Sequence, residues 1–218
     1  MTTAFAGMSF GVVGSSMDIG ATGTETDRLT AAGANVADTS TRTRSASDSA
    51  MTASLYLEYT LSDSVWPLTF GAELTPGTAD ISKKISRSDT ELSRTGQVAH
   101  TVLSKRRSAS AEATNMSTVY IEAPIFRGLY VKAGLANITV NHANDSGLED
   151  SSALTGTNLG LGFRTETAGG YILKASYEET DYDTLSLRST GNSVAANSTG
   201  VTADVDTEAY RLSIGKAF

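Results

Sequence analysis

Few side chains in this sequence could act as catalytic bases or thiol ligands. Cysteine is absent, and the two histidines, His100 and His142, are predicted to lie in separate loops. Serine and threonine are abundant, so hydroxyl partners for a Ser–His–acid site are available. Two solvated histidines are nevertheless the simpler interpretation. We therefore predict no catalytic residues, no enzyme activity and no bound cofactor.

Carboxylates are the second group that could do chemistry. Acidic clusters occupy Asp145–Asp150 and Glu178–Asp183, and such oxygens could bind Ca²⁺, but the spacing of an EF-hand is missing. Solvated loop charge is the favoured interpretation, and we predict no metal site. The formal net charge of -7 also argues against nucleic acid as a partner, since a phosphate-binding face is usually basic.

The elements that must position any site are strands, because apolar and polar residues alternate with a period of two. The clearest run covers 51–61, and it continues after a break as 68–75. The same hairpin pattern recurs as 119–123 with 129–136 and as 158–164 with 171–178. Two further strands, 6–12 and 209–218, stand at the ends of the chain. Pairing these end strands predicts one closed antiparallel all-β barrel of about eight strands, with residues 1–218 as a single domain.

The connections between these strands alternate in length. Three are tight turns, whereas those near 15–50, 76–112, 140–156 and 182–206 are long and rich in Ser, Thr, Asp and Asn. Long loops at one end and short turns at the other are typical of transmembrane β-barrels, with the long loops extracellular and the turns periplasmic. Strands in such proteins can extend beyond the bilayer, so part of each long loop could be strand.

The charges indicate which face of each strand points inward. The polar faces carry four acids and four bases, a balance that an enclosed lumen needs because an unpaired buried charge is costly. These eight predicted lumen residues are Glu58, Glu73, Glu122, Lys132, Arg164, Lys174, Glu178 and Arg211. The opposite faces, with Leu55, Leu57, Leu161 and Leu173, would then meet lipid. A soluble barrel would reverse this facing.

Aromatic residues and the last strand add to this interpretation. Trp66, Phe70, Phe126, Tyr171 and Phe218 lie close to the short turns, where an interfacial girdle would sit. The run 210–218 resembles the C-terminal signal of Gram-negative outer-membrane proteins. Its matching residues are Tyr210, Leu212, Ile214 and Phe218. Lys216 departs from the apolar pattern, but a lysine at the edge of the membrane can extend its ammonium to water.

Eight strands, four long connections and this terminal strand together resemble the small OmpA, OmpX and Opa type of outer-membrane β-barrel. The resemblance implies a location in the bacterial outer membrane, assembly by the barrel-assembly machinery, and outer-membrane lipids and lipopolysaccharide as surroundings. Basic residues in the second long connection, Lys83, Lys84, Arg87, Arg94, Lys105, Arg106 and Arg107, could pair with lipopolysaccharide phosphates or with acidic loops.

Two classes of function are consistent with these features. In the first, the barrel is a plugged anchor whose loops serve adhesion, recognition of a surface ligand or surface structure. In the second, it is a narrow porin-like channel for small solutes. Because eight strands enclose a lumen that side chains just fill, the anchor is favoured. An outer-membrane enzyme and a soluble ligand-binding barrel rank below both.

Overall fold

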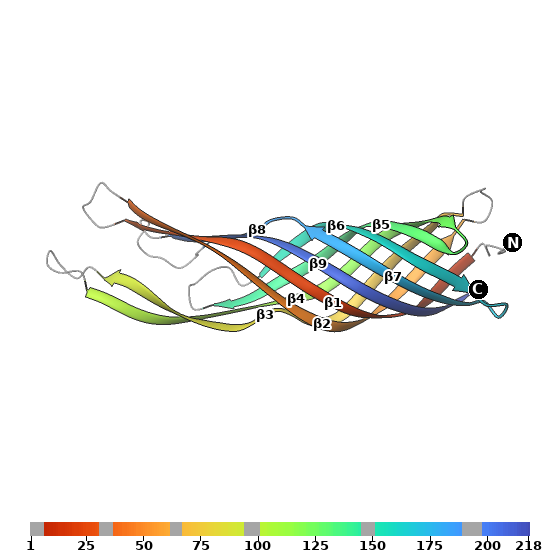
Figure 1. Ribbon diagram of the computed structural model, residues 1–218, viewed down its shortest axis with the longest axis horizontal. Coiled ribbons are helices and arrows are strands. Elements are labelled where there is room, and N and C mark those ends of the chain that lie inside the picture. Colours follow the sequence, from red (N-terminus) through yellow and green to blue (C-terminus); the bar gives the residue numbers. More distant parts are fainter. Residues whose placement is uncertain (1–6, 31–36, 62–66, 94–100, 145–150, 189–197) are drawn as a thin grey trace.

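The computed structural model describes residues 7–30, 37–61, 67–93, 101–144, 151–188 and 198–218. Nine strands occupy most of this part of the chain (Figure 1). They are β1 (Gly7–Thr30), β2 (Ala37–Thr60), β3 (Thr69–Ser93), β4 (Thr101–Phe126), β5 (Leu129–Asn144), β6 (Ser151–Glu166), β7 (Tyr171–Tyr182), β8 (Leu185–Arg188) and β9 (Ser198–Ala217). Within the described ranges there is no helix long and apolar enough to cross a membrane.

The strands form one closed antiparallel ring. Each of β1 to β6 pairs with the next strand, β7 pairs with β9, and β9 pairs back to β1 from Ser9↔Ala217 to Arg28↔Ser198. The short β8 pairs with β9 from Leu185↔Ala203, directly beyond the last β7 pair, Asp181↔Asp206. Strand β8 therefore continues β7 along the same edge of β9, and the ring has eight positions. The predicted fold class is confirmed.

Tight turns join the strands at one end of the ring, where the start of β1 lies beside the end of β9 (Figure 1). The β4–β5 turn places Arg127 and Gly128 at positive φ angles of 41° and 90°, the combination that suits the twist of a two-residue hairpin. In the β6–β7 turn, the amide of Gly170 donates to the Thr167 carbonyl at 2.9 Å. These turns fix which residues face one another inside the ring.

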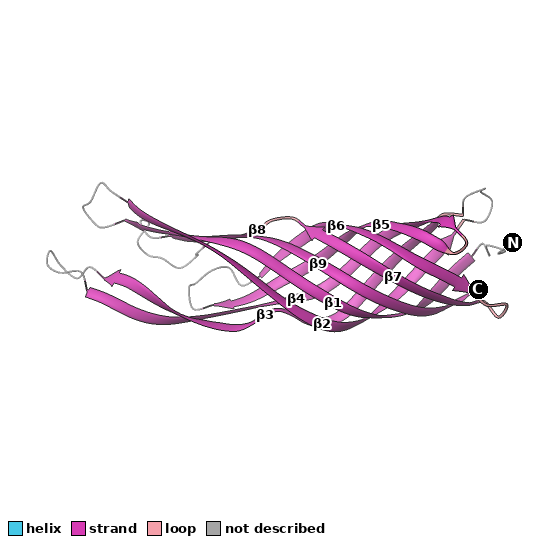
Figure 2. Ribbon diagram, in the orientation of Figure 1, coloured by secondary structure: helices cyan, strands magenta, loops and turns pink. Residues whose placement is uncertain are grey.

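The segments predicted as long loops are largely strand. Strands β1 and β2 pair from Gly7↔Thr60 to Thr30↔Ala37, and β3 and β4 pair as far as Ser93↔Thr101. Both hairpins run well beyond Leu55↔Leu74, the last described β2–β3 pair (Figure 2). Polar sequence did not prevent strand formation here, because each segment pairs its backbone with a neighbouring segment of similar length.

The inward face of the strands changes from polar to apolar along their length, which explains why these segments were predicted as loops. We call the end of the barrel with the short turns its lower end. In the lower part of β9, Leu212 and Ile214 point outward and Arg211 points inward. Further up the same strand, the buried residues are Ala203 and Val205. The period of two continues, but the face that was polar becomes apolar. The upper part of the barrel therefore has an apolar interior and a polar exterior, as a barrel in water does.

This apolar interior forms one cluster above the level of the eight predicted lumen charges, which we call the charged layer. It draws residues from β1, β3, β4, β5, β6, β8 and β9. Its members are Ile19, Ala79, Ile81, Ala113, Met116, Ile138, Val140, Leu154, Leu185, Leu187, Ala203 and Val205. The ring is thus filled by two layers, one charged and one apolar.

Strands β2 and β3 pair over a shorter stretch than most of their neighbours. Among the described residues their register runs only from Leu55↔Leu74 to Thr60↔Thr69. Beyond it, the β1–β2 and β3–β4 hairpins separate into two ribbons (Figure 1). On the β2 ribbon, residues 41–45 are exposed on both faces, so this ribbon projects into solvent.

Candidate functional site: the charged layer inside the barrel

The outer surface of the lower ring is apolar and exposed. The four residues predicted to face lipid have exposed fractions of 57% for Leu55, 49% for Leu57, 50% for Leu161 and 44% for Leu173. A protein in water rarely leaves so large an apolar surface uncovered, whereas a barrel in a bilayer requires one. The facing of a soluble barrel does not fit this arrangement.

The exposed apolar band is nearly as tall as the band of about 25 Å that is typical of outer-membrane barrels. On β9 it runs from Tyr210 to Phe218, which at a strand tilt of about 40° corresponds to roughly 20 Å. Phe218 stacks on Phe10 of β1, with ring centroids 5.3 Å apart. Lys216, which departs from the terminal pattern, places its ammonium 4.4 Å from the centroid of the Tyr171 ring and donates to the Gly169 carbonyl. The lysine therefore lies at the edge of the band, beside a turn.

All eight predicted lumen residues point into the ring. Six of them are buried: Glu58, Glu73, Glu122, Lys132, Lys174 and Glu178. The side chains of Arg164 and Arg211 are 21% and 11% exposed. The ion pairs divide these residues into two groups, each of two carboxylates and two cations.

The first group lies nearer the short turns and joins β2, β4, β6 and β7. Lys174 donates to Glu58 and, at 2.7 Å, to Glu122. Arg164 donates to Glu58 at 3.2 Å and lies 3.8 Å from Glu122. The Tyr120 hydroxyl also donates to Glu58, at 2.8 Å. Glu58, which is 1% exposed, thus keeps a hydrogen-bonded cation on each side.

The second group joins β3, β5, β7 and β9. Glu178 accepts from Lys132 at 2.8 Å and from Arg211 at 2.6 Å. The other nitrogen of Arg211 contacts Glu73, and Lys132 lies 4.0 Å from Glu73. Each group is therefore neutral, and each links four strands across the lumen. Such cross-links meet the requirement that buried charges be paired and hydrogen-bonded.

Three tyrosines fill the space between these groups, and sequence reasoning did not single them out. Tyr56 lies beside Gly11, Tyr120 beside Gly71 and Tyr130 beside Gly162 on the neighbouring strands. A methyl group at Gly71 would lie 2.2 Å from a Tyr120 ring carbon, so the glycine makes room for the ring. A tyrosine on the polar face of one strand opposite a glycine of the next was the signal available in the sequence.

Almost no space remains inside the charged layer. The cavity among Tyr56, Tyr120, Tyr130 and the ion pairs has a volume of ≈ 10 Å³. That is about the minimum that one water molecule needs. Lys132 fills part of the lumen by placing its ammonium 4.0 Å from the centroid of the Tyr120 ring. The layer is therefore a packed core of charges and aromatic rings.

No protein-family model matches the sequence, and no curated protein sequence matches it either. Among solved structures, the chain is similar to the outer-membrane protein OprG from Pseudomonas aeruginosa, with 13% identity over 99% of this chain and 98% of that chain and a TM-score of 0.48. It is also similar to Ail, the attachment invasion locus protein of Yersinia pestis, with 14% identity, 91% and 98% coverage and a TM-score of 0.32. A third similar structure is the outer-membrane protease OmpT from Escherichia coli, with 9% identity, 95% and 97% coverage and a TM-score of 0.40.

These likenesses carry no residue role across to this chain. Its own geometry decides the matter: a closed ring, an exposed apolar band and paired charges inside. The chain is an outer-membrane β-barrel. Closure of the ring pairs the backbone N–H and C=O groups, which hydrocarbon cannot hydrogen-bond. Proteins that span the bacterial outer membrane use such closed β-barrels.

The remaining predicted residues are distributed as follows. His142 lies in β5 opposite Ala111, not in a loop. The acidic run 178–183 is split between two faces, because Glu178 points into the lumen while Glu179 and Asp181 are exposed. In the part of the chain that the structure describes, no three His, Asp or Glu side chains gather to hold a metal ion. Trp66, His100, Asp145–Asp150 and Arg94, and the side chains of Lys83, Lys84, Arg87, Lys105, Arg106 and Arg107, lie outside the described residues.

Proposed function

We propose that this protein is a sealed outer-membrane anchor that holds two long β-ribbons outside the cell. The observation that carries the proposal is the volume of ≈ 10 Å³ in the cavity lined by the lumen tyrosines and ion pairs, which is too little for a continuous column of water at that level. A narrow solute channel would need a hydrated path along the same axis. The lumen charges then serve to close and cross-link the ring.

The apolar cluster supports the same proposal as a second seal. Ile19, Ile81 and Val140 are each 1–2% exposed, so the upper lumen is packed as well as the lower. An ion would have to break buried ion pairs and then cross an apolar layer without hydration. Each step is unfavourable by several kcal/mol.

The ribbons support the second part of the proposal, which is that the barrel holds polar segments outside the cell. Strand β1 continues about 14 residues beyond Ser16, about 45 Å of extended chain, and β9 stays paired with it as far as Arg28↔Ser198. On β2, residues 41–45 expose hydroxyl groups on one face and guanidinium groups on the other. A paired ribbon with polar surfaces on both sides suits adhesion or recognition, because a backbone already ordered by strand pairing loses little conformational entropy when it binds.

Planar-bilayer recording tests the sealing. The unmodified protein should give no steady conductance, whereas Tyr120→Ala combined with Ile81→Ala should give small, transient openings because both layers are thinned. Gel mobility with and without heating checks that the variant is folded. A large, steady conductance from the unmodified barrel would favour the channel instead.

Cysteine labelling tests whether the ribbons lie outside the cell. Because the sequence contains no cysteine, only the introduced residue can be labelled. Thr43→Cys, on the exposed part of β2, should react with a membrane-impermeant maleimide in intact cells. Ala168→Cys, in the short β6–β7 turn, should react only after the outer membrane is permeabilised. The opposite result would place the ribbons in the periplasm and end the proposal.

A further inference from the structure

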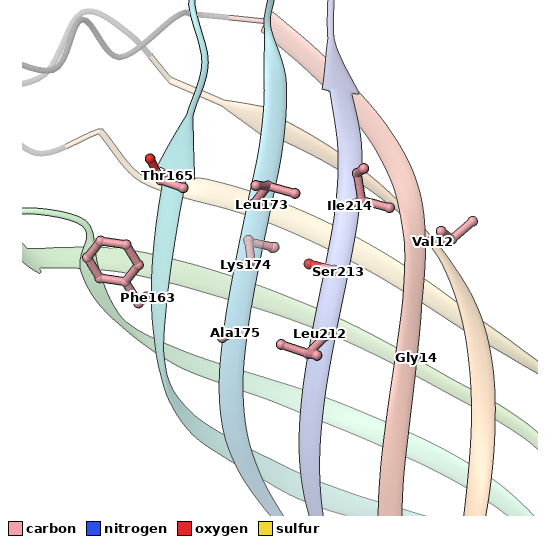
Figure 3. A pocket seen from close by; sticks show the side chains of 10 residues that line it. All are labelled: Val12, Gly14, Phe163, Thr165, Leu173, Lys174, Ala175, Leu212, Ser213 and Ile214. Atoms are coloured by element: carbon pink, nitrogen blue, oxygen red, sulfur yellow. The ribbon is translucent and has the colours of Figure 1, made fainter.

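The outer surface of the barrel carries a shallow trough across β6, β7, β9 and β1. One stretch has a volume of ≈ 490 Å³ and is lined by apolar residues that include Phe163, Leu173 and Ile214 (Figure 3). A second stretch of ≈ 670 Å³ reaches Tyr177, Tyr210 and Met51. Gly14, Ala175 and Leu212 line both stretches, so the two are continuous.

Small residues leave this trough open. Gly14 and Ala175 both lie opposite Leu212 on the strand between them. A methyl group built at Gly14 would meet nothing within 4 Å, unlike one at Gly71. The glycine at position 14 is therefore not required by packing inside the protein. It leaves room for an apolar chain from the surrounding bilayer.

The upper end of the trough changes from apolar to aromatic and then to acidic. In register, Ser16, Tyr210 and Tyr177 form one row across β1, β9 and β7. The two tyrosine rings lie 5.1 Å apart at 48°, and the Tyr177 hydroxyl donates to Glu179 at 2.7 Å. The next outward row consists of Asp18, Glu208 and Glu179, all of them exposed.

Like charges directly opposite one another destabilise a sheet. Glu208 faces a carboxylate on both neighbouring strands, so a cation near this row would relieve the repulsion. No three acidic side chains among the described residues converge on a metal-ion position. A diffuse organic cation fits the row better, because an ammonium can lie over a tyrosine face while it meets several carboxylates.

We propose that the trough binds a membrane amphiphile with an ammonium headgroup. Its acyl chain would lie along Gly14 and Ala175, and its headgroup would lie between the tyrosine pair and the carboxylate row. Charge complementarity selects the headgroup, and the trough selects a chain parallel to the strands. This inference requires the exterior to face lipid and is independent of whether the lumen conducts.

Spin-label spectroscopy in phosphatidylglycerol vesicles tests the inference. Two probes share one nitroxide-labelled acyl chain and differ in the headgroup, which is trimethylammonium in one and hydroxyl in the other. The unmodified barrel should immobilise the ammonium probe with about tenfold preference over the hydroxyl probe at low salt, the size expected for exposed charge pairs plus one cation–π contact. The preference should shrink as salt is added.

Three variants make the experiment decisive. Glu179→Gln with Glu208→Gln should abolish the preference, whereas Asp80→Asn with Glu112→Gln, which removes an opposed acidic pair from β3 and β4, should retain it. Gly14→Leu, which fills the trough, should also remove the preference while the barrel stays folded.

The inference is overturned if the unmodified barrel shows no preference, if both acidic double variants behave alike, or if Gly14→Leu changes nothing. A motionally restricted lipid component that is present for both probes would still show that the exterior faces lipid. Failure of the trough site is therefore distinguishable from failure of the membrane assignment.

Discussion

Removal of the Lys174 ammonium should destabilise the barrel by about 3 kcal/mol. In the folded protein this ammonium donates to both Glu58 and Glu122, and no more than 9% of the residue is exposed. Lys174→Met leaves the first group with two carboxylates and one cation. Breaking a buried pair on one side costs about 3–5 kcal/mol. Arg164 still lies 3.2 Å from Glu58 and is partly solvated, so the lower end of that range applies.

Urea unfolding in lipid vesicles, with the midpoint and slope measured for each variant, checks this value. Lys174→Met combined with Glu122→Gln restores neutrality in the group and should recover about 2 kcal/mol of the loss. Lys216→Met is the matched control, because its ammonium lies outside the lumen, and it should cost less than about 1 kcal/mol. A loss below about 1 kcal/mol for Lys174→Met would mean that lumen water screens the pair, and the sealed layer would be refuted.

Three further predictions concern the wall of the barrel and its last strand. Leu57→Arg, on the exposed face of β2, should cost about 2–4 kcal/mol in vesicle unfolding if the position is near the midplane, and a neutral result would contradict the facing. Gly71→Ala should destabilise the barrel because its methyl would overlap Tyr120, whereas Gly14→Ala should leave the urea midpoint unchanged; equal effects would refute the Tyr–Gly packing. Phe218→Ala should lower the amount inserted in cells, measured by membrane fractionation, while refolding in detergent stays largely intact. Equal loss in both settings would mean that Phe218 acts only through packing.

The sequence alone determined the strands of the lower ring, their order and their facing. The period of two from Met51 to Leu61 needs no distant information, because successive side chains of any strand point to opposite faces. The balance of four acids against four bases indicated an enclosed polar lumen. Closure by the first and last strands followed from the rule that a bilayer leaves no sheet edge unpaired.

Tertiary structure decided what those strands bring together. Glu58 and Arg164 are 106 residues apart, and only the register around the whole ring sets them within hydrogen-bond distance. The same register places each lumen tyrosine against a glycine. The upper barrel was missed because Ala203 and Val205 make the inward face of β9 apolar above the membrane. Alternation in the sequence reveals that the two faces of a strand differ in polarity. Whether the outward face meets lipid or water depends on where the bilayer ends along the barrel.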